Sequence, residues 1–410
     1  MSASQPEPTA DRPRLRPLEF KPVEYEGERY LFLRDPLRLS DQTLLIPEPF
    51  IPLLTLMDGT RDLSGLQFSL SLRYRLRMTR ERIQALIASL DEACLLENAR
   101  ARNQQGELLS SYRRASARPP SLAGSGYPAE PDALSELLDR YLVESQEPAP
   151  QKPVRGVISP HIDYDRGAPV YAAAWQAAAT AARRARLVIL LGTDHFSEGL
   201  PFTLTRVPYA TPYGTLPLPD DLVDELAAAM GPSAFTGELH HRTEHSIELA
   251  SVWLHHVRRR EPVAVLPLLV GSLGDLDGAP QSSWEHSLYQ RVISILRREC
   301  FRAPTLVVAA ADLSHVGPAF GDSAPNTPAR DALSVSDRAI LDVALSGRSR
   351  DFYQAVQANG DRTRICGLAP ITMLLDVLAS PGRSTLHSYA ICPADDTDTS
   401  FVSIAAATFE

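Results

Sequence analysis

Four apolar runs in the second part of the chain constrain the fold more than any other feature. They cover residues 154–159, 187–192, 263–270 and 305–311. Helical stretches separate them, and none shows the polar alternation of a strand with one solvated face, so we expect helices on both faces of the sheet. This order predicts an α/β fold, a three-layer α/β/α sandwich with a mostly parallel central sheet. Two later runs, 386–394 and 401–409, alternate more and predict an antiparallel pair at the sheet edge.

Changes in composition divide the chain into four parts. Residues 1–17 are polar and rich in proline, which predicts a disordered N-terminus. Residues 18–98 combine short β-type runs with helical periods, one of them capped by Thr79, and predict a small α+β domain that is winged-helix-like. Residues 99–122 carry no apolar period and are predicted to be a linker, so the α/β domain would occupy residues 123–410.

Titratable side chains follow three of the predicted strands directly. His161, His195 and His315 come soon after the runs that end at 159, 192 and 311, and Asp312 stands at the end of the last run. The carboxyl ends of parallel neighbours meet at the same edge of a sheet, so these four side chains are expected to meet there. Imidazole and carboxylate ligands together suit Zn, Fe, Cu or Ni.

Cys366 lies just before an apolar helix predicted at 368–378. A helix N-terminus favours the thiolate, which attacks electrophiles and binds metals, but a buried structural cysteine fits the same position. Another helix is predicted after Thr243, which can cap it. His245 and Glu248 would then share one helical face and could supply a general base or a carboxylate that supports a metal ligand.

Charge and cysteine usage argue against several classes of protein. The formal net charge of −9 disfavours binding to nucleic acid or to an anionic membrane. The four cysteines show no CxxC spacing, which fits reduced thiols better than a secreted disulfide framework. Residues 1–16 lack the apolar core of a signal peptide, and no apolar stretch reaches the roughly 20 residues that cross a bilayer. We therefore expect a cytoplasmic protein without a membrane partner.

The N-terminal domain is locally basic, with arginines at positions 73, 75, 77, 80 and 82. In a winged-helix-like domain such arginines can bind DNA or a peptide, whereas a solvated helix face would show the same pattern. The sequence around these arginines shows no pattern typical of side chains that contact DNA bases. Nucleic-acid binding is therefore not expected, and peptide docking and a solvated face both stay open.

Short motifs in the second part of the chain point to a known family through their joint order. They are PHIDYDRG (160–167), LGTDHF (191–196), PYGTL (212–216), EHSIE (244–248), PLLVG (267–271), ADLSH (311–315) and ICG (365–367). In this order they resemble the Memo family, whose bacterial and archaeal members are often called AmmeMemoRadiSam system protein B. The resemblance extends over residues 120–410. Residues 25–98 are similar, through a weaker motif, to PqqD-like winged-helix modules.

The resemblance implies a fold similar to that of class III extradiol ring-cleaving dioxygenases, which carry an Fe(II) site. It implies a pocket formed by His161, His195, Asp312, His315 and Cys366. Among these, His161, His195 and Cys366 match the family's metal-binding positions. The implied metal is Fe(II) or Cu, no nucleotide cofactor is expected, and a partner from a radical-SAM system is implied by family association.

Three functions stay open at this point. One is a metal-dependent redox role, including an oxygen-using, dioxygenase-like reaction. A cysteine replaces the carboxylate ligand of the ring-cleaving enzymes, so ring cleavage itself is not carried over. A second is a binding protein, either a metal carrier or a peptide adaptor. A third is a hydrolase with Cys366 as nucleophile and His161 or His315 as base. The partner would be a small molecule or a peptide.

Overall fold

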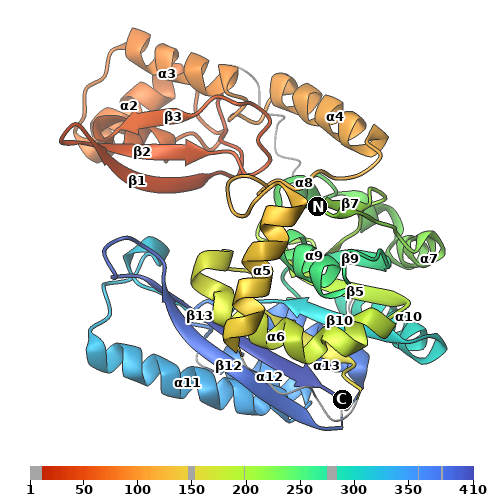
Figure 1. Ribbon diagram of the computed structural model, residues 1–410. Coiled ribbons are helices and arrows are strands. Elements are labelled where there is room, and N and C mark those ends of the chain that lie inside the picture. Colours follow the sequence, from red (N-terminus) through yellow and green to blue (C-terminus); the bar gives the residue numbers. More distant parts are fainter. Residues whose placement is uncertain (1–11, 146–152, 198, 275–283, 359, 380–381) are drawn as a thin grey trace. The chain divides into compact units, whose positions relative to one another are not determined.

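The computed structural model describes residues 12–145, 153–197, 199–274, 284–358, 360–379 and 382–410 (Figure 1). The chain separates into two compact units, Met1–Arg114 and Ala115–Glu410, each of which is described by itself. Within the described ranges, no helix combines the length and the apolar character needed to cross a membrane.

The N-terminal unit has the small α+β composition that the sequence predicts. Its strands β1 (Glu19–Tyr25), β2 (Glu28–Arg34) and β3 (Leu44–Pro47) form an antiparallel sheet in that order. Its helices are α1 (Ile51–Leu54), α2 (Leu63–Tyr74), α3 (Arg80–Glu92) and α4 (Ala99–Arg114). Glu26 and Gly27 both have positive φ, as the two-residue turn between β1 and β2 requires. One buried apolar cluster joins the sheet to α1, α2 and α3, and the winged-helix assignment stays a prediction.

Helix α4 corrects the predicted linker at 99–122. The Asn98 side chain accepts a hydrogen bond from the Ala101 N–H at 3.1 Å, and helix-favouring Arg, Gln, Glu and Leu residues follow. Within α4 only Ala101 and Tyr112 are buried, so its apolar period is too sparse to recognise in the sequence. The division between the two units falls after Arg114, where the helix ends.

The predicted disorder at 1–17 falls mainly on residues outside the described ranges. The part that is described is paired with the rest of the unit. Leu15 forms a β-bridge with Leu96. Arg16 forms an ion pair with Asp35 at 2.9 Å, and both side chains are less than a tenth exposed. The prediction of disorder was therefore wrong for Leu15 and Arg16. Their partners lie elsewhere in the chain, and a buried arginine is held in place by its carboxylate partner.

The described residues of the C-terminal unit form an eight-stranded mixed sheet. The four predicted parallel strands are β4 (Gly156–Ser159), β5 (Leu187–Thr193), β9 (Ala264–Val270) and β10 (Thr305–Ala310). They lie side by side in the order β4-β10-β5-β9, and the short β6 (Phe202–Thr203) is antiparallel to β9. On the other side β13 (Phe401–Phe409) pairs antiparallel with β4, and β11 (His315–Val316) and β12 (Ser384–Pro393) pair with β13. A separate hairpin consists of β7 (Tyr209–Thr211) and β8 (Gly214–Leu216).

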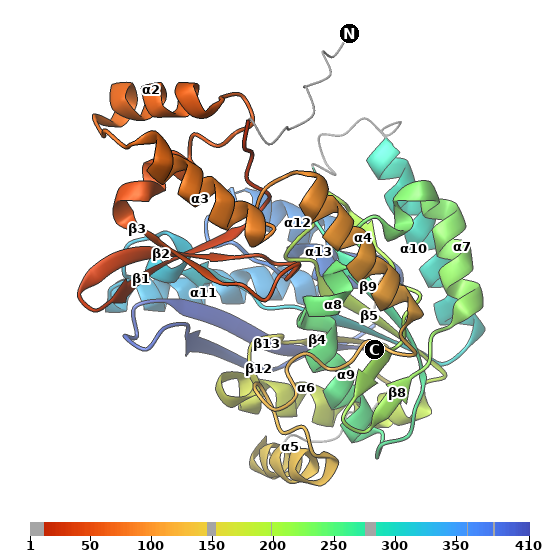
Figure 2. The same ribbon diagram turned by 90° about the horizontal axis from the view of Figure 1, so that it is seen from above.

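Helices cover both faces of this sheet, which confirms the predicted three-layer sandwich (Figure 2). One face packs against α6 (Tyr164–Arg184) and α9 (Ser246–Val257), with α5 (Pro131–Ser145) packed on these helices. The elements of the other face are α7 (Asp220–Met230), α10 (Trp284–Arg302), α11 (Thr327–Leu345), α12 (Ser349–Gln357) and α13 (Leu368–Leu378). The short α8 (His240–Thr243) precedes α9. Strands β4 and β5 are buried along their whole length, which explains their uninterrupted apolar runs.

Candidate metal centre

Three neighbouring parallel strands bring titratable side chains to one edge of the sheet. His161, Asp312 and His195 each lie two residues past the end of their strand, and these strands, β4, β10 and β5, are adjacent in that order. The structure therefore places the three side chains together, as the shared strand direction requires. His161 is 2% exposed and Asp312 is 3% exposed. These two side chains are therefore shielded from solvent at this edge of the sheet.

The backbone fixes the imidazole of His161. Its Nδ1 donates to the Ala310 carbonyl oxygen at 3.0 Å, because a carbonyl can only accept. When the ring is neutral, Nε2 therefore carries the lone pair, and it lies 3.4 Å from Cys366 Sγ and 3.6 Å from Asp312 Oδ2. Burial lowers the pKa of His161, but the negative charges of Asp312 and Cys366 outweigh it and raise the pKa to about 9.

Cys366 reaches the same place from the loop before α13. The Gly367 N–H donates to the Asp312 carbonyl oxygen at 3.0 Å. A Cβ on Gly367 would lie 2.5 Å from that oxygen, so only glycine lets the loop approach the end of β10 this closely. Burial raises the pKa of the Cys366 thiol, but the imidazoles of His161 and His315 outweigh it and lower the pKa to about 5. The thiol is therefore held as a thiolate at neutral pH.

A buried carboxylate that the sequence analysis did not single out supports two of the imidazoles. Glu244 is fully buried between α8 and α9. Its Oε2 accepts from His195 Nδ1 at 3.0 Å, and His245 Nδ1 lies 3.2 Å from its Oε1. Burial raises the pKa of Glu244, but the imidazoles of His195 and His245 outweigh it and hold the pKa well below its usual range. The motif EHSIE contains this residue, directly before His245, and that adjacency is the only signal in the sequence.

The imidazoles of His161, His195 and His245 form one cluster. The His195 and His245 rings are stacked with centroids 5.0 Å apart, and the His161 ring stands perpendicular to both at 5.1 and 5.4 Å. Donor atoms of His161, His195 and Cys366 all lie within 4.8 Å of one another, and so do those of His195, Glu244 and His245. Because His195 turns Nδ1 toward Glu244, its Nε2 is left for the first set.

The predicted start of the helix in the EHSIE motif was wrong. Helix α9 begins at Ser246, so His245 precedes the helix and Thr243 belongs to α8 instead of capping α9. The Glu244 carboxylate accepts from the main-chain N–H groups of His245 and Ser246 at 2.8 and 3.0 Å. A glutamate two residues before the helix therefore satisfies N–H groups at its start, which the capping rule for Thr, Ser, Asp and Asn does not anticipate.

Glu248 lies apart from the imidazole cluster, so the predicted supporting role for it was also wrong. Its carboxylate is fully buried and paired with the guanidinium of Arg118. It also accepts from the Tyr127 hydroxyl at 2.5 Å and from the main-chain N–H groups of Ser121 and Leu122 at 2.9 and 2.8 Å. Glu248 thus fixes the segment that precedes α5 and takes no part in either donor set.

His315 lies at the rim of the site. Its Nδ1 is 2.9 Å from the Leu313 carbonyl oxygen and 3.0 Å from that of Arg364. Its ring packs against Phe320 at 5.1 Å. His315 belongs to neither donor set of the described residues, and it acts on Cys366 through its charge.

A cavity of about 260 Å³ lies beside Cys366. Residues from the ends of β5 and β9, from α12 and from the loop before α13 line it, including Thr193, Gly271, Tyr353 and Asp361. Its volume is just below the roughly 300–1,000 Å³ typical of ligand pockets, so it has room for a small molecule only.

Replacing Glu244 with Gln is expected to weaken metal binding at this cluster about 10–100-fold, the usual range for a side chain that orients a metal ligand. The neutral amide removes the negative charge that holds His195 and His245. Competition titration with a chromophoric chelator measures the change. Glu238, another buried glutamate of this unit, provides the control variant Glu238→Gln, which should bind within twofold of wild type. Equal affinities for both variants would contradict the role of Glu244.

Comparison with known proteins shows which family the chain is similar to. The family described as "Memo-like protein" matches residues 118–408. A MEMO1 family protein of Aquifex aeolicus is 28% identical over 371 residues, which cover 90% of this chain and 92% of the relative. MEMO1 family proteins of Thermus thermophilus and Methanosarcina acetivorans are each 28% identical, covering 78% and 67% of this chain and 91% of each relative. The Aquifex match is longer than the family segment, so it reaches into the N-terminal unit.

Proposed function

The chain belongs to the Memo-like protein family, and on this premise we propose that it binds iron or copper through His161, His195 and Cys366 and serves a metal-dependent redox role. The main support for this proposal is that donor atoms of these three residues all lie within 4.8 Å of one another. Two imidazoles and a thiolate are ligands that suit iron and copper. When bound, either metal would supply one-electron redox chemistry at this position.

Residues around the three donor groups orient the two imidazoles for metal binding. The Ala310 carbonyl fixes the tautomer of His161, and Glu244 does the same for His195, so that both Nε2 atoms are free to bind. His245 is an imidazole beside the cluster that can move a proton. The neighbouring cavity would hold a small substrate, and the finer form of the proposal is an oxygen-using, dioxygenase-like reaction on it.

Elemental analysis of the full chain after anaerobic purification tests the metal proposal. We expect close to one Fe or Cu per chain, or the same uptake when the metal-free protein is titrated with Fe(II) or Cu(I). A protein that contains no metal after purification and then takes up neither Fe(II) nor Cu(I) would contradict the proposal. Oxygen consumption by the metal-bound protein, measured in the presence of small organic acids and phenols, then tests the proposed oxygen-using reaction.

A cysteine-dependent hydrolase is a second candidate, supported by the 3.4 Å approach of Cys366 Sγ to His161 Nε2. A cysteine activated by a histidine is the usual nucleophile of such enzymes. The metal-free protein would then hydrolyse p-nitrophenyl acetate with a burst, bound metal would suppress it, and Cys366→Ser would abolish it. Hydrolysis that persists in Cys366→Ser would exclude this candidate.

Iodoacetamide alkylation of the metal-free protein provides a pH-dependent measurement. The pKa of Cys366 is about 5, so its alkylation rate should be constant above about pH 6 and fall about tenfold per pH unit below pH 5. Burial raises the pKa of Cys300 to about 11, so its rate should still rise at pH 8. Mass spectrometry of the labelled peptides separates the two cysteines. Parallel pH profiles would show that Cys366 is an ordinary thiol.

A further inference from the structure

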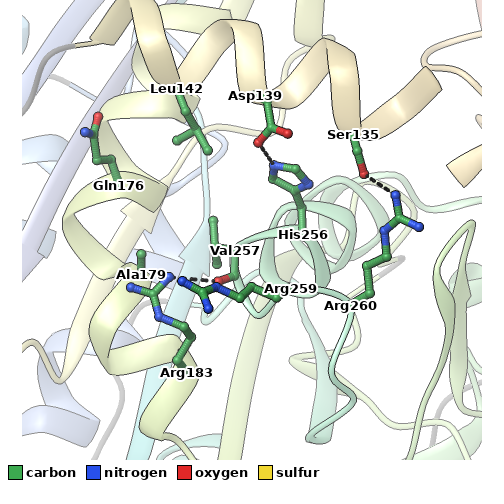
Figure 3. Close-up of a pocket in the computed structure, with 10 residues that line it drawn as sticks. All are labelled: Ser135, Asp139, Leu142, Gln176, Ala179, Arg183, His256, Val257, Arg259 and Arg260. Atoms are coloured by element: carbon green, nitrogen blue, oxygen red, sulfur yellow. Dashed lines mark hydrogen bonds and ion pairs between the residues drawn. The ribbon is translucent and has the colours of Figure 1, made fainter. Parts of the chain in front are cut away.

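A second cavity, of about 460 Å³, lies in the C-terminal unit between α5, α6 and the end of α9 (Figure 3). None of the residues that line it belongs to the two donor sets of the metal centre. Its volume falls within the roughly 300–1,000 Å³ of small-molecule sites. The cavity is therefore distinct from the metal centre and large enough for a small molecule.

The cavity is lined by more positive than negative charge. Arg183, Arg259 and Arg260 line it together with a single carboxylate, that of Asp139. Asp139 is already engaged, since it accepts from His256 Nε2 at 3.1 Å (Figure 3). The excess of guanidinium groups stands out in a chain whose net charge is −9. Such a local excess favours an anion.

Three consecutive arginines at the end of α9 have different partners. Arg258 is bound to main-chain carbonyls, among them those of Ala182, Glu261 and Pro262, and so joins α9 to α6. Arg260 donates to two side chains of α5, Ser135 Oγ at 2.9 Å (Figure 3) and the Asp132 carboxylate at 2.8 Å, so its charge is already paired. The side chain of Arg259, by contrast, makes no hydrogen bond or ion pair within the described ranges.

Arg183 also retains free donors, because its side chain makes a single hydrogen bond to the described part of the chain, from Nη1 to the Val257 carbonyl oxygen at 3.1 Å. Its other guanidinium N–H groups remain available to a ligand. Arg259 and Arg260 moreover have left-handed φ values of 59° and 65°. Backbone of this kind is strained for arginine, and such strain tends to gather at binding sites.

The remaining lining residues define the rest of the ligand. Leu142, Ala179 and Val257 give the cavity an apolar surface. Gln176 also lines it, and its buried Oε1 has no hydrogen-bond partner among the described residues. A buried carbonyl oxygen of this kind requires a donor. An occupant with an anionic group, an apolar body and a hydrogen-bond donor would satisfy all three features.

We propose that this cavity binds a small organic anion, a carboxylate or a phosphate monoester, whose charged group is held by Arg183 and Arg259. Guanidinium groups recognise both kinds of anion through paired N–H donors. The apolar body of the ligand would pack against Leu142 and Ala179, and a hydroxyl or amino group would donate to Gln176. The site is separate from the metal centre and does not depend on the function proposed for it.

Isothermal titration calorimetry of the full chain with phenyl phosphate, benzoate and inorganic phosphate tests the proposal. We expect saturable binding of one phenyl phosphate or one benzoate per chain, at least tenfold tighter than inorganic phosphate because the apolar body is also buried. Arg183→Gln and Arg259→Gln should each weaken the tighter ligand at least tenfold. Arg184 is an exposed neighbour that does not line the cavity, and Arg184→Gln should stay within twofold of wild type.

Two results would overturn the proposal. One is the absence of saturable binding for both organic anions. The other is an equal loss in Arg184→Gln and Arg183→Gln, which would indicate general attraction to a basic surface. Thermal unfolding of each variant verifies that the fold is kept, and metal content verifies that the metal centre is unaffected. A loss of metal in Arg183→Gln would contradict the separation of the two sites.

Discussion

Replacing Cys366 with serine is expected to weaken the binding of iron or copper by more than about 100-fold, since even side chains that only orient ligands are worth about 10–100-fold. A serine hydroxyl stays protonated near neutral pH and is a poor ligand for these metals, whereas the thiol of Cys366 is already ionised. His161→Ala and His195→Ala remove an imidazole from the same set and should lose the metal as well. Elemental analysis and chelator competition measure the loss.

Matched controls come from residues outside the cluster. Cys300→Ser removes a thiol whose pKa is raised by burial, and His387→Ala removes an imidazole on β12 that contacts Thr408. Both should keep the metal. If Cys366→Ser is folded and keeps it too, the proposed ligand set is wrong. Metal retained in Cys366→Ser but lost in His195→Ala would instead place the ion beside Glu244.

Replacing Arg118 with alanine is expected to lower the free energy of unfolding of the C-terminal unit by about 3–5 kcal/mol, because it leaves a buried charge on Glu248 without its partner. Arg118 also donates to the carbonyl oxygens of His241 and Glu244 at 2.7 and 2.9 Å, so the variant loses these bonds too. Denaturation by urea, followed by tryptophan fluorescence, measures the effect. All three tryptophans lie in the C-terminal unit, so this signal reports on that unit alone.

An exposed ion pair provides the comparison. Arg348 and Asp351 are paired at 2.9 Å with side chains 70% and 43% exposed, and Arg348→Ala should cost less than about 1 kcal/mol. The double variant Arg118→Met/Glu248→Leu should be more stable than Arg118→Ala, since no unpaired charge remains. Similar losses for Arg118→Ala and Arg348→Ala would show that the buried pair contributes little.

The strand ends of the site could be predicted from the sequence because they depend on local patterns alone. Four apolar runs without alternation define parallel strands, and the strand direction then places His161, Asp312 and His195 at one edge. The order of the strands is not needed for this conclusion. The helix after Cys366 could likewise be predicted from its apolar residues, but the place of Cys366 in the pocket was implied by the family resemblance alone.

The roles of the two glutamates, Glu244 and Glu248, could not be assigned in the same way. Glu248 has a helical spacing to His245, yet its partner Arg118 is distant in sequence and follows no period. Glu244 has its role because it lies close to His195, a contact that only the folded chain creates. Helix α4 was missed for a related reason: a helix with two buried residues has almost no apolar stripe.

Strand β13 lies between β4 and β11 in the sheet, so the strand that carries His161 has its two neighbours, β10 and β13, far along the chain. Since synthesis runs from the N-terminus, β4 leaves the ribosome long before either neighbour exists. A nascent chain then presents two histidines without the thiolate of Cys366 and without the walls that bury them. The three donor groups of the proposed metal site therefore come together only after the chain has folded.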